Sequence, residues 1–202
     1  MMDWDARYRD AQTPWDKATH HPYLDQMRPR RGKKTRVLVP GCGRGHDARA
    51  LARIFPDGEI IAVDMSKTAL AQAELLGMPE NVRLIHADLF HLGDEWDASF
   101  DLVWEHTCFC AILPTERIAY REVMRRLLKR GGILLGAFFM NLEEDDDGGP
   151  PFNCPVEEFT EVFSDGSGFM IRRMGLLQHT FRGREGEEWS AILSRHAAAR
   201  NA

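Results

Sequence analysis

The chain has 202 residues, of which 44% are hydrophobic and 28% are charged, and its formal net charge is -5. These values predict a globular protein that buries its own core, and the acidic balance disfavours nucleic acid as a partner because phosphate binding needs a concentrated positive face. The sequence shows no signal peptide and no apolar run near the roughly 18 residues of a membrane span. We therefore expect a cytoplasmic monomer or weak dimer, with neither nucleic acid nor a membrane as a partner.

The first 34 residues precede the regular pattern and contain two helical candidates, at 4–11 and 20–28. From residue 35 onward, apolar strand-like runs alternate with helical patterns. Strands are expected at 35–40, 59–64, 82–87, 100–104 and 133–140. Helices are expected at 46–55, at 67–76 with Ser66 as N-cap and Gly77 as stop, and at 115–129 with Thr115 as N-cap.

Strands this apolar, separated by helices, predict a mostly parallel sheet with helices on both faces. The end of the chain differs, because strand-like runs at 170–180 and 187–195 flank a short polar turn and predict an antiparallel hairpin. We expect an α/β fold with seven strands, forming one domain over 1–202 with a helical N-terminal lid at 1–34 and a core at 35–202. The acidic tract at 143–149 is predicted to be a charged loop.

A glycine-rich turn ends the first strand and opens the next helix. Its residues are Pro40, Gly41, Cys42, Gly43 and Gly45. Glycine lets the chain turn sharply and lets a ligand approach bare backbone, while the helix N-terminus adds free N–H groups. Asp64 ends the second strand, 19 residues beyond Gly45, where a carboxylate accepts hydrogen bonds from ribose hydroxyls. The pattern predicts a site for an adenosine-containing cofactor without choosing that cofactor.

The spacing of the glycines resembles that of class I methyltransferases, because it reads G-x-G-x-G and position 46 is histidine where a dinucleotide fingerprint has its third glycine. Three further segments resemble the thiopurine and thiol methyltransferase family. They are Trp4–Asp16 with its T-P-W-D motif, Asp101–Thr107 continuing to Arg117, and the G-G-P-P-F loop at Gly148–Phe152.

This resemblance implies a Rossmann-like class I methyltransferase fold and S-adenosyl-L-methionine as the cofactor. It implies a cofactor site made of the glycine loop and of Trp4, Trp15, Asp64, Met65, Ala87, Asp88, Leu89 and Glu105. Asp88 would receive the adenine amino group, although an N-cap role is the competing interpretation. The substrate pocket would be lined by Thr107, Phe109 and Phe152. The acceptor would be a small soft nucleophile such as a thiol, thiopurine, halide or chalcogen oxyanion.

The candidate catalytic residues follow from the chemistry of methyl transfer. A sulfonium methyl group is already activated, so no metal is required, but a thiol acceptor must lose its proton. His106 is the best candidate base, or it only shapes the pocket. Glu105 either steers the sulfonium and holds His106 or is a buried structural carboxylate. Arg117 either holds an anionic substrate or lowers the pKa of a thiol, or it forms a surface salt bridge on its helix. Cys108 and Cys110 are expected to be pocket or core residues.

Other functions share some of these features. A nicotinamide-dependent oxidoreductase would use the same strand, glycine turn and Asp64, but His46 and the G-G-P-P-F loop argue against it. The remaining alternatives are methylation of another small molecule, of tRNA or of protein, and a non-catalytic protein that keeps the fold. The identity of the acceptor stays open.

Overall fold

The computed structural model describes residues 2–142, 149–164 and 166–196, so most of the predicted acidic loop lies outside the described residues. Contacts group the chain into two compact units. The first unit is Met1–Leu92 with His179–Phe181, and the second unit is Gly93–Gln178 with Arg182–Ala202. The seven strands have the order β3-β2-β1-β4-β5-β7-β6. This order, with its antiparallel C-terminal strands, confirms the predicted fold class.

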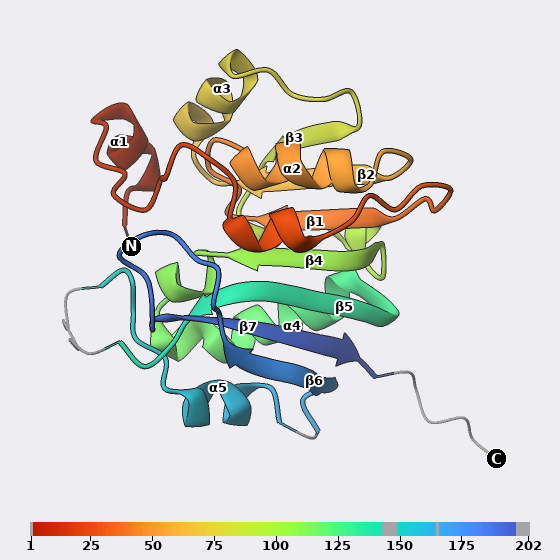
Figure 1. The fold of residues 1–202 in the computed structure, drawn as a ribbon, viewed down its shortest axis with the longest axis vertical. Helices are drawn as coiled ribbons and strands as arrows, with labels where there is room; N and C mark the ends of the chain where they lie inside the picture. The colour runs from red at the N-terminus through yellow and green to blue at the C-terminus, as the bar shows by residue number, and fades with distance from the viewer. Residues whose placement is uncertain (1, 143–148, 165, 197–202) are drawn as a thin grey trace. The chain divides into compact units, whose positions relative to one another are not determined.

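The first unit contains three parallel strands, β1 (Arg36–Pro40), β2 (Glu59–Asp64) and β3 (Val82–His86). Helices α2 (His46–Ile54) and α3 (Lys67–Leu75) connect these strands and pack on them, as Figure 1 shows. The N-terminal residues form α1 (Trp4–Arg9), which lies beside α3, and a 3-10 helix at Pro22–Gln26. A second 3-10 turn, Leu89–His91, follows β3. The carboxyl ends of β1 and β2 therefore lie side by side and present their loops at the same edge.

The second unit contains β4 (Phe100–His106) and β5 (Leu128–Phe139), which are parallel, and the antiparallel strands β6 (Phe169–Leu176) and β7 (Glu188–Arg195). Helices α4 (Arg117–Leu127) and α5 (Val156–Val162) pack against each other. Short 3-10 turns lie at Asp94–Trp96, Phe109–Ala111 and Pro114–Glu116. The antiparallel pairing of β6 with β7 confirms the predicted hairpin.

The region after β4 differs from the prediction in two places. Thr115 is not an N-cap, because Pro114 begins a 3-10 turn and the helix begins only at Arg117, without a side-chain cap. The next strand begins at Leu128 and not at 133, since fully buried Leu128 pairs with Phe100 and continues the sheet through the glycine pair. Elsewhere Ser66 caps α3 as predicted, its Oγ accepting a hydrogen bond from the amide of Ala69.

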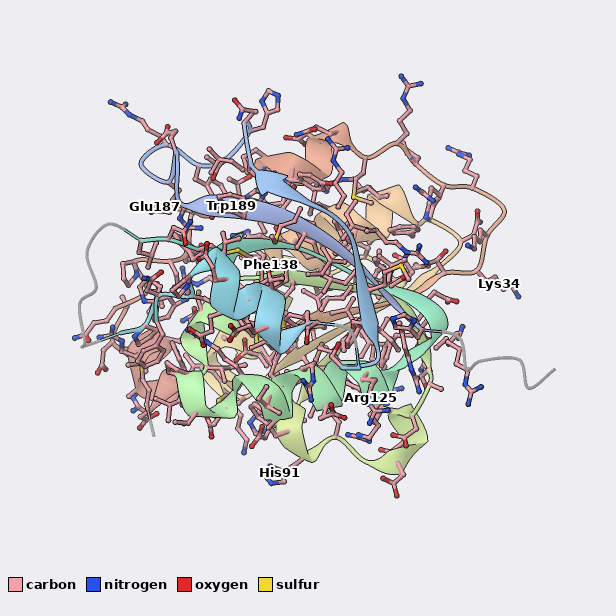
Figure 2. All side chains as sticks on the ribbon, turned by 90° about the horizontal axis from the view of Figure 1, so that it is seen from below. Lys34, His91, Arg125, Phe138, Glu187 and Trp189 are labelled. Carbon is pink, nitrogen blue, oxygen red and sulfur yellow. The ribbon has the colours of Figure 1, made fainter. Side chains whose placement is uncertain are left out.

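Aromatic side chains form the core of the second unit. Their rings meet mostly edge to face at centroid distances from 4.8 to 6.2 Å, a favourable geometry for aromatic pairs. The cluster comprises Phe109, Tyr120, Phe138, Phe159, Phe163 and Phe169. In Figure 2 Phe138 lies inside this unit, whereas Arg125 lies at its periphery. In the described part of the chain, no helix combines the length and the apolar character needed to cross a membrane.

Candidate active site

The glycine turn of the first unit has a backbone that only glycine adopts easily. Gly41, Gly43 and Gly45 have φ values of 56°, 52° and 68°. A Cβ added to Gly43 would lie 2.5 Å from the hydroxyl oxygen of Tyr8. Gly45 precedes α2 and offers no side-chain cap, so the first N–H groups of this helix are left for a ligand or solvent. The turn is therefore a backbone cradle at a helix N-terminus.

Asp64 braces this cradle from the end of β2. Its Oδ2 accepts a hydrogen bond of 2.7 Å from the amide of Gly43, and its Oδ1 accepts one of 2.8 Å from the amide of Ser66. Burial raises the pKa of the Asp64 carboxyl, and the two amide donors oppose that rise. Each carboxylate oxygen can accept a second hydrogen bond. Asp64 can thus hold the loop and receive hydroxyl groups at the same time.

Other predicted cofactor residues lie around these two strand ends. The amide of Cys42 donates to the carbonyl of Val63, and the amide of Ala87 donates to the carbonyl of Asp64. Met65 is partly exposed, whereas Leu89 is buried. Asp88 caps the 3-10 turn through an accepted hydrogen bond of 2.9 Å from the Phe90 amide. The cap role of Asp88 is confirmed, and its contact with adenine stays a prediction.

Aromatic residues of the N-terminal segment cover the glycine turn. The indole N–H of Trp15 donates to the Tyr8 hydroxyl over 3.2 Å, and the rings of Trp4 and Trp15 meet edge to face at 5.4 Å. Tyr8 is buried, and burial raises the pKa of its hydroxyl, with the nearby Asp64 carboxylate adding to the rise. The predicted Trp4 and Trp15 therefore belong to one aromatic cluster with Tyr8.

Two aspartates fasten this segment to the loops of β1 and β2. Asp5 Oδ1 accepts hydrogen bonds from the Ser66 hydroxyl at 2.9 Å and from the Thr68 amide at 2.8 Å, at the start of α3. Asp16 Oδ2 pairs with Arg44 Nη1 at 2.7 Å, and its Oδ1 lies 3.3 Å from His46 Nε2.

The contacts of Asp16 set its pKa. Burial alone would raise the pKa of Asp16. The nearby His46 imidazole, the hydrogen bond from the Ala18 amide and the charge of Arg44 outweigh burial and lower it to about 2. The side chain at position 46, where a dinucleotide fingerprint has its third glycine, therefore faces Asp16 of the N-terminal segment.

In the second unit, Glu105 organises the loop that follows β4. Its Oε1 accepts hydrogen bonds of 2.8 and 2.9 Å from the amides of Cys108 and Phe109. Its Oε2 is buried without a hydrogen-bond partner. Burial raises the pKa of Glu105 to about 7, although the hydrogen bonds from the two amides oppose that rise. Glu105 is thus a buried carboxyl group that braces the loop; its predicted contacts with the cofactor remain a prediction.

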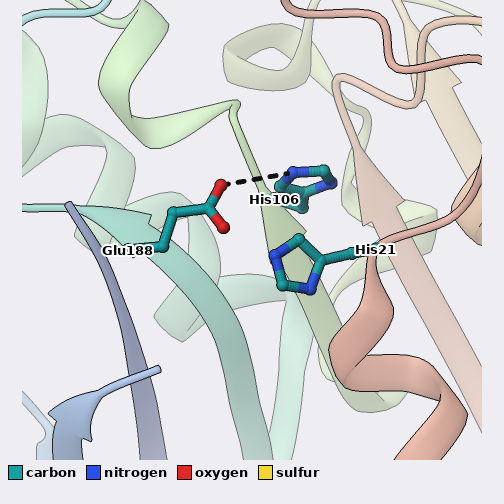
Figure 3. A group of neighbouring side chains, drawn as sticks. All are labelled: His21, His106 and Glu188. Atoms are coloured by element: carbon teal, nitrogen blue, oxygen red, sulfur yellow. Dashed lines mark ion pairs between the residues drawn. The ribbon is translucent and has the colours of Figure 1, made fainter. Parts of the chain in front are cut away.

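His106 ends β4 beside a buried ion pair. Arg184 Nη1 donates to Glu188 Oε1 at 2.9 Å and lies 3.3 Å from His106 Nε2. Glu188 Oε1 itself lies 4.0 Å from His106 Nε2, the pair joined by the dashed line in Figure 3. Glu188 is fully buried, and Arg184 stacks over the Phe139 ring at 4.9 Å. The candidate base therefore faces one positive and one negative group.

Arg117 is buried and holds the G-G-P-P-F loop in place. Its guanidinium donates to Glu158 Oε1 at 2.6 Å, to the Asn153 carbonyl at 2.6 Å and to the Phe152 carbonyl at 3.3 Å, and it lies over the Phe109 ring at 5.5 Å. The guanidinium of this salt bridge is therefore buried and the pair joins α4 to α5, in contrast to the surface salt bridge on the helix that was the alternative, and anion binding stays a prediction.

The predicted pocket residues meet beside this loop. Phe109 is fully buried, the Phe152 amide donates to the carbonyl of Cys110 over 2.7 Å, and the Thr107 hydroxyl donates to the carbonyl of His106. The structure therefore brings the sequence-predicted loop residues together, while their contact with a substrate stays a prediction.

Comparison with known proteins assigns the family. Residues 1–191 match the family described as thiopurine S-methyltransferase. The chain belongs to this family. It is similar to thiocyanate methyltransferase 1 of Arabidopsis thaliana, with 34% identity over 166 residues that cover 79% of this chain and 70% of the relative. It is also similar to thiopurine S-methyltransferase of Aliivibrio fischeri strain MJ11, with 29% identity over 165 residues that cover 75% and 74% of the two chains.

A solved structure supports the fold. The 1,6-didemethyltoxoflavin-N1-methyltransferase of Burkholderia thailandensis, determined with S-adenosylhomocysteine bound, superposes with a TM-score of 0.68 at 21% identity. The superposition covers 96% of this chain and 86% of that one. The fold is the class I Rossmann-like methyltransferase fold, and this family member is an S-adenosylmethionine-dependent methyltransferase of small nucleophiles. The nicotinamide alternative is thereby excluded.

The cradle of the first unit fits S-adenosylmethionine. Gly43 brings its bare backbone against the Tyr8 hydroxyl, where a Cβ would lie 2.5 Å from the oxygen, and Asp64 retains acceptor capacity for ribose hydroxyls. The uncapped start of α2 suits the carboxylate of the methionine part. When bound, the cofactor supplies an activated methyl group.

Sequence reasoning missed several residues of these sites. In the first unit these are the anchors Asp5, Asp16 and His46 and the ring of Tyr8. In the second unit they are Arg184 and Glu188. The T-P-W-D motif contains Asp16, so a signal existed for that residue. Arg184 and Glu188 lie in a polar stretch without a local pattern, and only the pairing of β7 with β5 brings them near the other site residues.

Proposed function

We propose that this enzyme transfers the methyl group of S-adenosylmethionine to a small sulfur nucleophile, and that His106 removes the proton of a thiol acceptor. The observation that carries this proposal is the position of His106, which ends β4 with Nε2 at the buried ion pair of Arg184 and Glu188. Two relatives are named for thiocyanate and for thiopurines, both of which offer sulfur to the methyl donor. Halides, selenium compounds and chalcogen oxyanions are soft acceptors of the same class.

The protein contributes alignment and proton removal to this reaction. In-line displacement needs the acceptor atom about 3 to 3.5 Å behind the methyl carbon. The thiolate is the attacking form, so a thiol with a pKa above the ambient pH needs a base. Imidazole accepts a proton near neutral pH and is suited to that role. An anion such as thiocyanate has no proton to lose and requires alignment only.

We also infer that residues 1–34 are a lid over the cofactor, and that residues 1–202 act as one methyltransferase domain. Asp5, Tyr8 and Asp16 support this inference, because each bonds to or packs on the loops that follow β1 and β2. A cation over aromatic rings gains roughly 0.5 to 2 kcal/mol, so Trp4 and Trp15 suit a sulfonium ligand. Opening and closing of the segment would admit and retain the cofactor.

The setting of the enzyme follows from charge and cysteine chemistry. We propose a cytoplasmic monomer or weak dimer that acts on small molecules and not on nucleic acid. All four cysteines are free thiols, which suits a reducing compartment, and the net charge of -5 opposes binding to phosphates.

One experiment tests the acceptor class. The purified enzyme is incubated with methyl-labelled S-adenosylmethionine and a panel of thiols, thiopurines, thiocyanate, halides, selenite and tellurite, and the methylated products are quantified. We expect the highest kcat/KM for sulfur acceptors. Absence of labelled product from every sulfur acceptor of the panel would contradict the proposal.

The variant His106→Asn tests the base. General-base help is typically worth about 100- to 10,000-fold, so the variant should lose that much kcat/KM with thiols of high pKa and little with thiocyanate. The ratio of kcat/KM between wild type and variant is plotted against acceptor pKa. A flat plot would show that His106 only shapes the pocket.

A further inference from the structure

The buried ion pair beside His106 has an arrangement that constrains the state of the imidazole. Arginine only donates hydrogen bonds, so Arg184 Nη1 at 3.3 Å from His106 Nε2 makes Nε2 the acceptor. His106 is therefore neutral in this arrangement, with its proton on Nδ1. The same Nη1 atom donates to Glu188 Oε1 at 2.9 Å. Arg184 thus contacts both the candidate base and the carboxylate through the same nitrogen atom.

A proton on Nε2 would change which neighbour the imidazole attracts. The imidazolium would repel the Arg184 guanidinium and attract Glu188, whose Oε1 is already 4.0 Å from Nε2. An N–H···O hydrogen bond needs about 2.9 Å, so a relative movement of about 1 Å brings the two atoms into contact. Both charged partners are buried, which makes their interactions with the imidazole strong.

We propose that Arg184 and Glu188 are positioning residues for His106: Arg184 orients the neutral imidazole, and Glu188 stabilises the imidazolium formed when His106 takes a proton. This inference rests on the proposed function, in which the proton comes from a thiol. The S–H bond breaks, the hydrogen bond from Arg184 to Nε2 is released, the proton binds Nε2, and the electron pair stays on sulfur. As this pair forms the bond to the methyl carbon, the methyl–sulfonium bond breaks toward the neutral thioether, and the proton later leaves His106 for solvent.

The charge balance explains why both partners are needed. Before proton transfer, the charges of Arg184 and Glu188 cancel and the imidazole is neutral. After proton transfer, the Glu188 carboxylate faces two cations, the Arg184 guanidinium and the His106 imidazolium. Without Glu188, the imidazolium would lose this negative partner while the positive Arg184 stayed beside it. Two other titratable groups of the second unit lie near this cluster. They are the buried Glu105, which precedes His106 in the chain, and Cys110, whose thiol pKa is raised by burial while the charge of Arg184 opposes that rise.

Two substitutions should move the pKa of His106 in opposite directions. Glu188→Gln removes the negative partner and should lower it by about 1 unit, whereas Arg184→Met removes the positive partner and should raise it by a similar amount. The pKa is measured by NMR titration of histidine-labelled enzyme without acceptor, with His106→Asn used to assign the signal. The acid limb of kcat/KM for a thiol should shift in the same directions. Glu187→Gln is the matched control, since it removes the same charge from the neighbouring residue and should leave the signal unchanged.

The outcomes separate this inference from the proposed function. Opposite shifts support the inference even if the acceptor panel identifies no sulfur substrate, because the NMR titration needs no turnover. Unchanged His106 titration in both variants overturns it, even if the enzyme methylates thiols. If either single variant fails to fold, the double variant Arg184→Met with Glu188→Gln buries no unpaired charge. Its His106 signal should titrate close to wild type while thiol turnover stays reduced at least tenfold, and wild-type turnover would overturn the inference.

Discussion

The two units of this methyltransferase build their sites from different materials. The first unit uses mainly backbone: three left-handed glycines and one carboxylate that receives two amide hydrogen bonds. The second unit uses side chains from distant segments: His106 from β4, Arg184 from a loop and Glu188 from β7. A backbone cradle recognises groups that every ligand of the fold shares, whereas a side-chain cluster changes with single substitutions. This contrast explains how family members can share a cofactor and differ in their acceptors.

The same contrast predicts different kinds of fragility. In the first unit, cofactor affinity should fall when a side chain is added to a glycine of the turn, and stability should fall when a contact of the N-terminal segment is removed. In the second unit, stability should fall when one residue of a buried, hydrogen-bonded set of charged side chains is removed, because the partner left behind remains in a low dielectric.

The largest stability effect is expected for Arg117→Met. Arg117 is 1% exposed and donates to Glu158 and to the carbonyls of Phe152 and Asn153, at the end of the G-G-P-P-F loop. Glu158 is 40% exposed and stays solvated without its partner, so the cost comes from the carbonyls that lose their donor. That cost is about 1 to 3 kcal/mol for each carbonyl, which chemical denaturation measures directly. Arg125→Met is the control on the same helix, since its side chain is 44% exposed and pairs with Glu122. The control should change stability by less than about 1 kcal/mol, and an equal loss in both variants would refute the structural role of Arg117.

The cradle is tested by Gly43→Ala, which should weaken cofactor binding by about 10- to 100-fold. Alanine at a φ of 52° costs about 1 to 3 kcal/mol, and its Cβ would lie 2.5 Å from the Tyr8 hydroxyl. Calorimetry with S-adenosylhomocysteine measures the affinity.

A matched control separates strain from crowding. Gly77 has a φ of 79° with no atoms near the added Cβ, so Gly77→Ala should lower stability and leave affinity intact. Adding Tyr8→Phe to Gly43→Ala removes the crowding oxygen and should recover part of the affinity. A full loss in the double variant would mean that backbone strain alone disables the loop.

The two units also differ in how far sequence alone predicts them. The glycine loop, Asp64 and the alternation of strands and helices were predictable because a strand, a turn and a helix are adjacent in sequence and follow local rules. Arg184 and Glu188 were not, because they approach His106 only through antiparallel pairing of β7 with β5. The start of α4 was mispredicted because Thr115 looks like a cap, while Pro114 places it in a 3-10 turn.

Asp16→Asn tests how charge fastens the N-terminal segment. Because its contacts lower the pKa of Asp16 to about 2, the ionised form stabilises the folded state. Stabilisation from a depressed pKa is complete above the unfolded value and is lost as the pH falls through the folded one. The variant should be about 2 kcal/mol less stable above pH 5, and the difference should shrink to about half near pH 3. Urea unfolding at several pH values, with Asp10→Asn as an exposed control, gives the comparison. If the difference in free energy of unfolding between wild type and Asp16→Asn did not depend on pH, the charge of Asp16 would not be its cause.

The smallest effect on stability is expected for Glu105→Gln, and this variant distinguishes the two roles proposed for the carboxyl group. Burial raises the pKa of Glu105 to about 7, above its ordinary value of 4.5, so the folded state holds the proton that the unfolded chain releases. A raised carboxyl pKa makes folding less favourable as the pH rises between these two values. Glutamine cannot ionise, and its carbonyl oxygen can still accept from the Cys108 and Phe109 amides. The variant should therefore gain about 1 kcal/mol relative to wild type between pH 6 and pH 8.5, which thermal melting in the two buffers detects.

The kinetics of Glu105→Gln complete the argument. If Glu105 only braces the loop, turnover at pH 7 should stay within about threefold of wild type, because the shape and both amide contacts survive. If its negative charge steers the cofactor sulfonium, the KM for S-adenosylmethionine should rise, and it should rise most above pH 7, where the wild-type carboxyl group is ionised. If the glutamine variant matches wild type in both KM and pH profile, holding the loop after β4 is the whole function of residue 105. A pH-dependent gap would instead join this carboxylate of the second unit to the recognition of the cofactor, and would weaken the division of labour between a backbone cradle and a side-chain cluster.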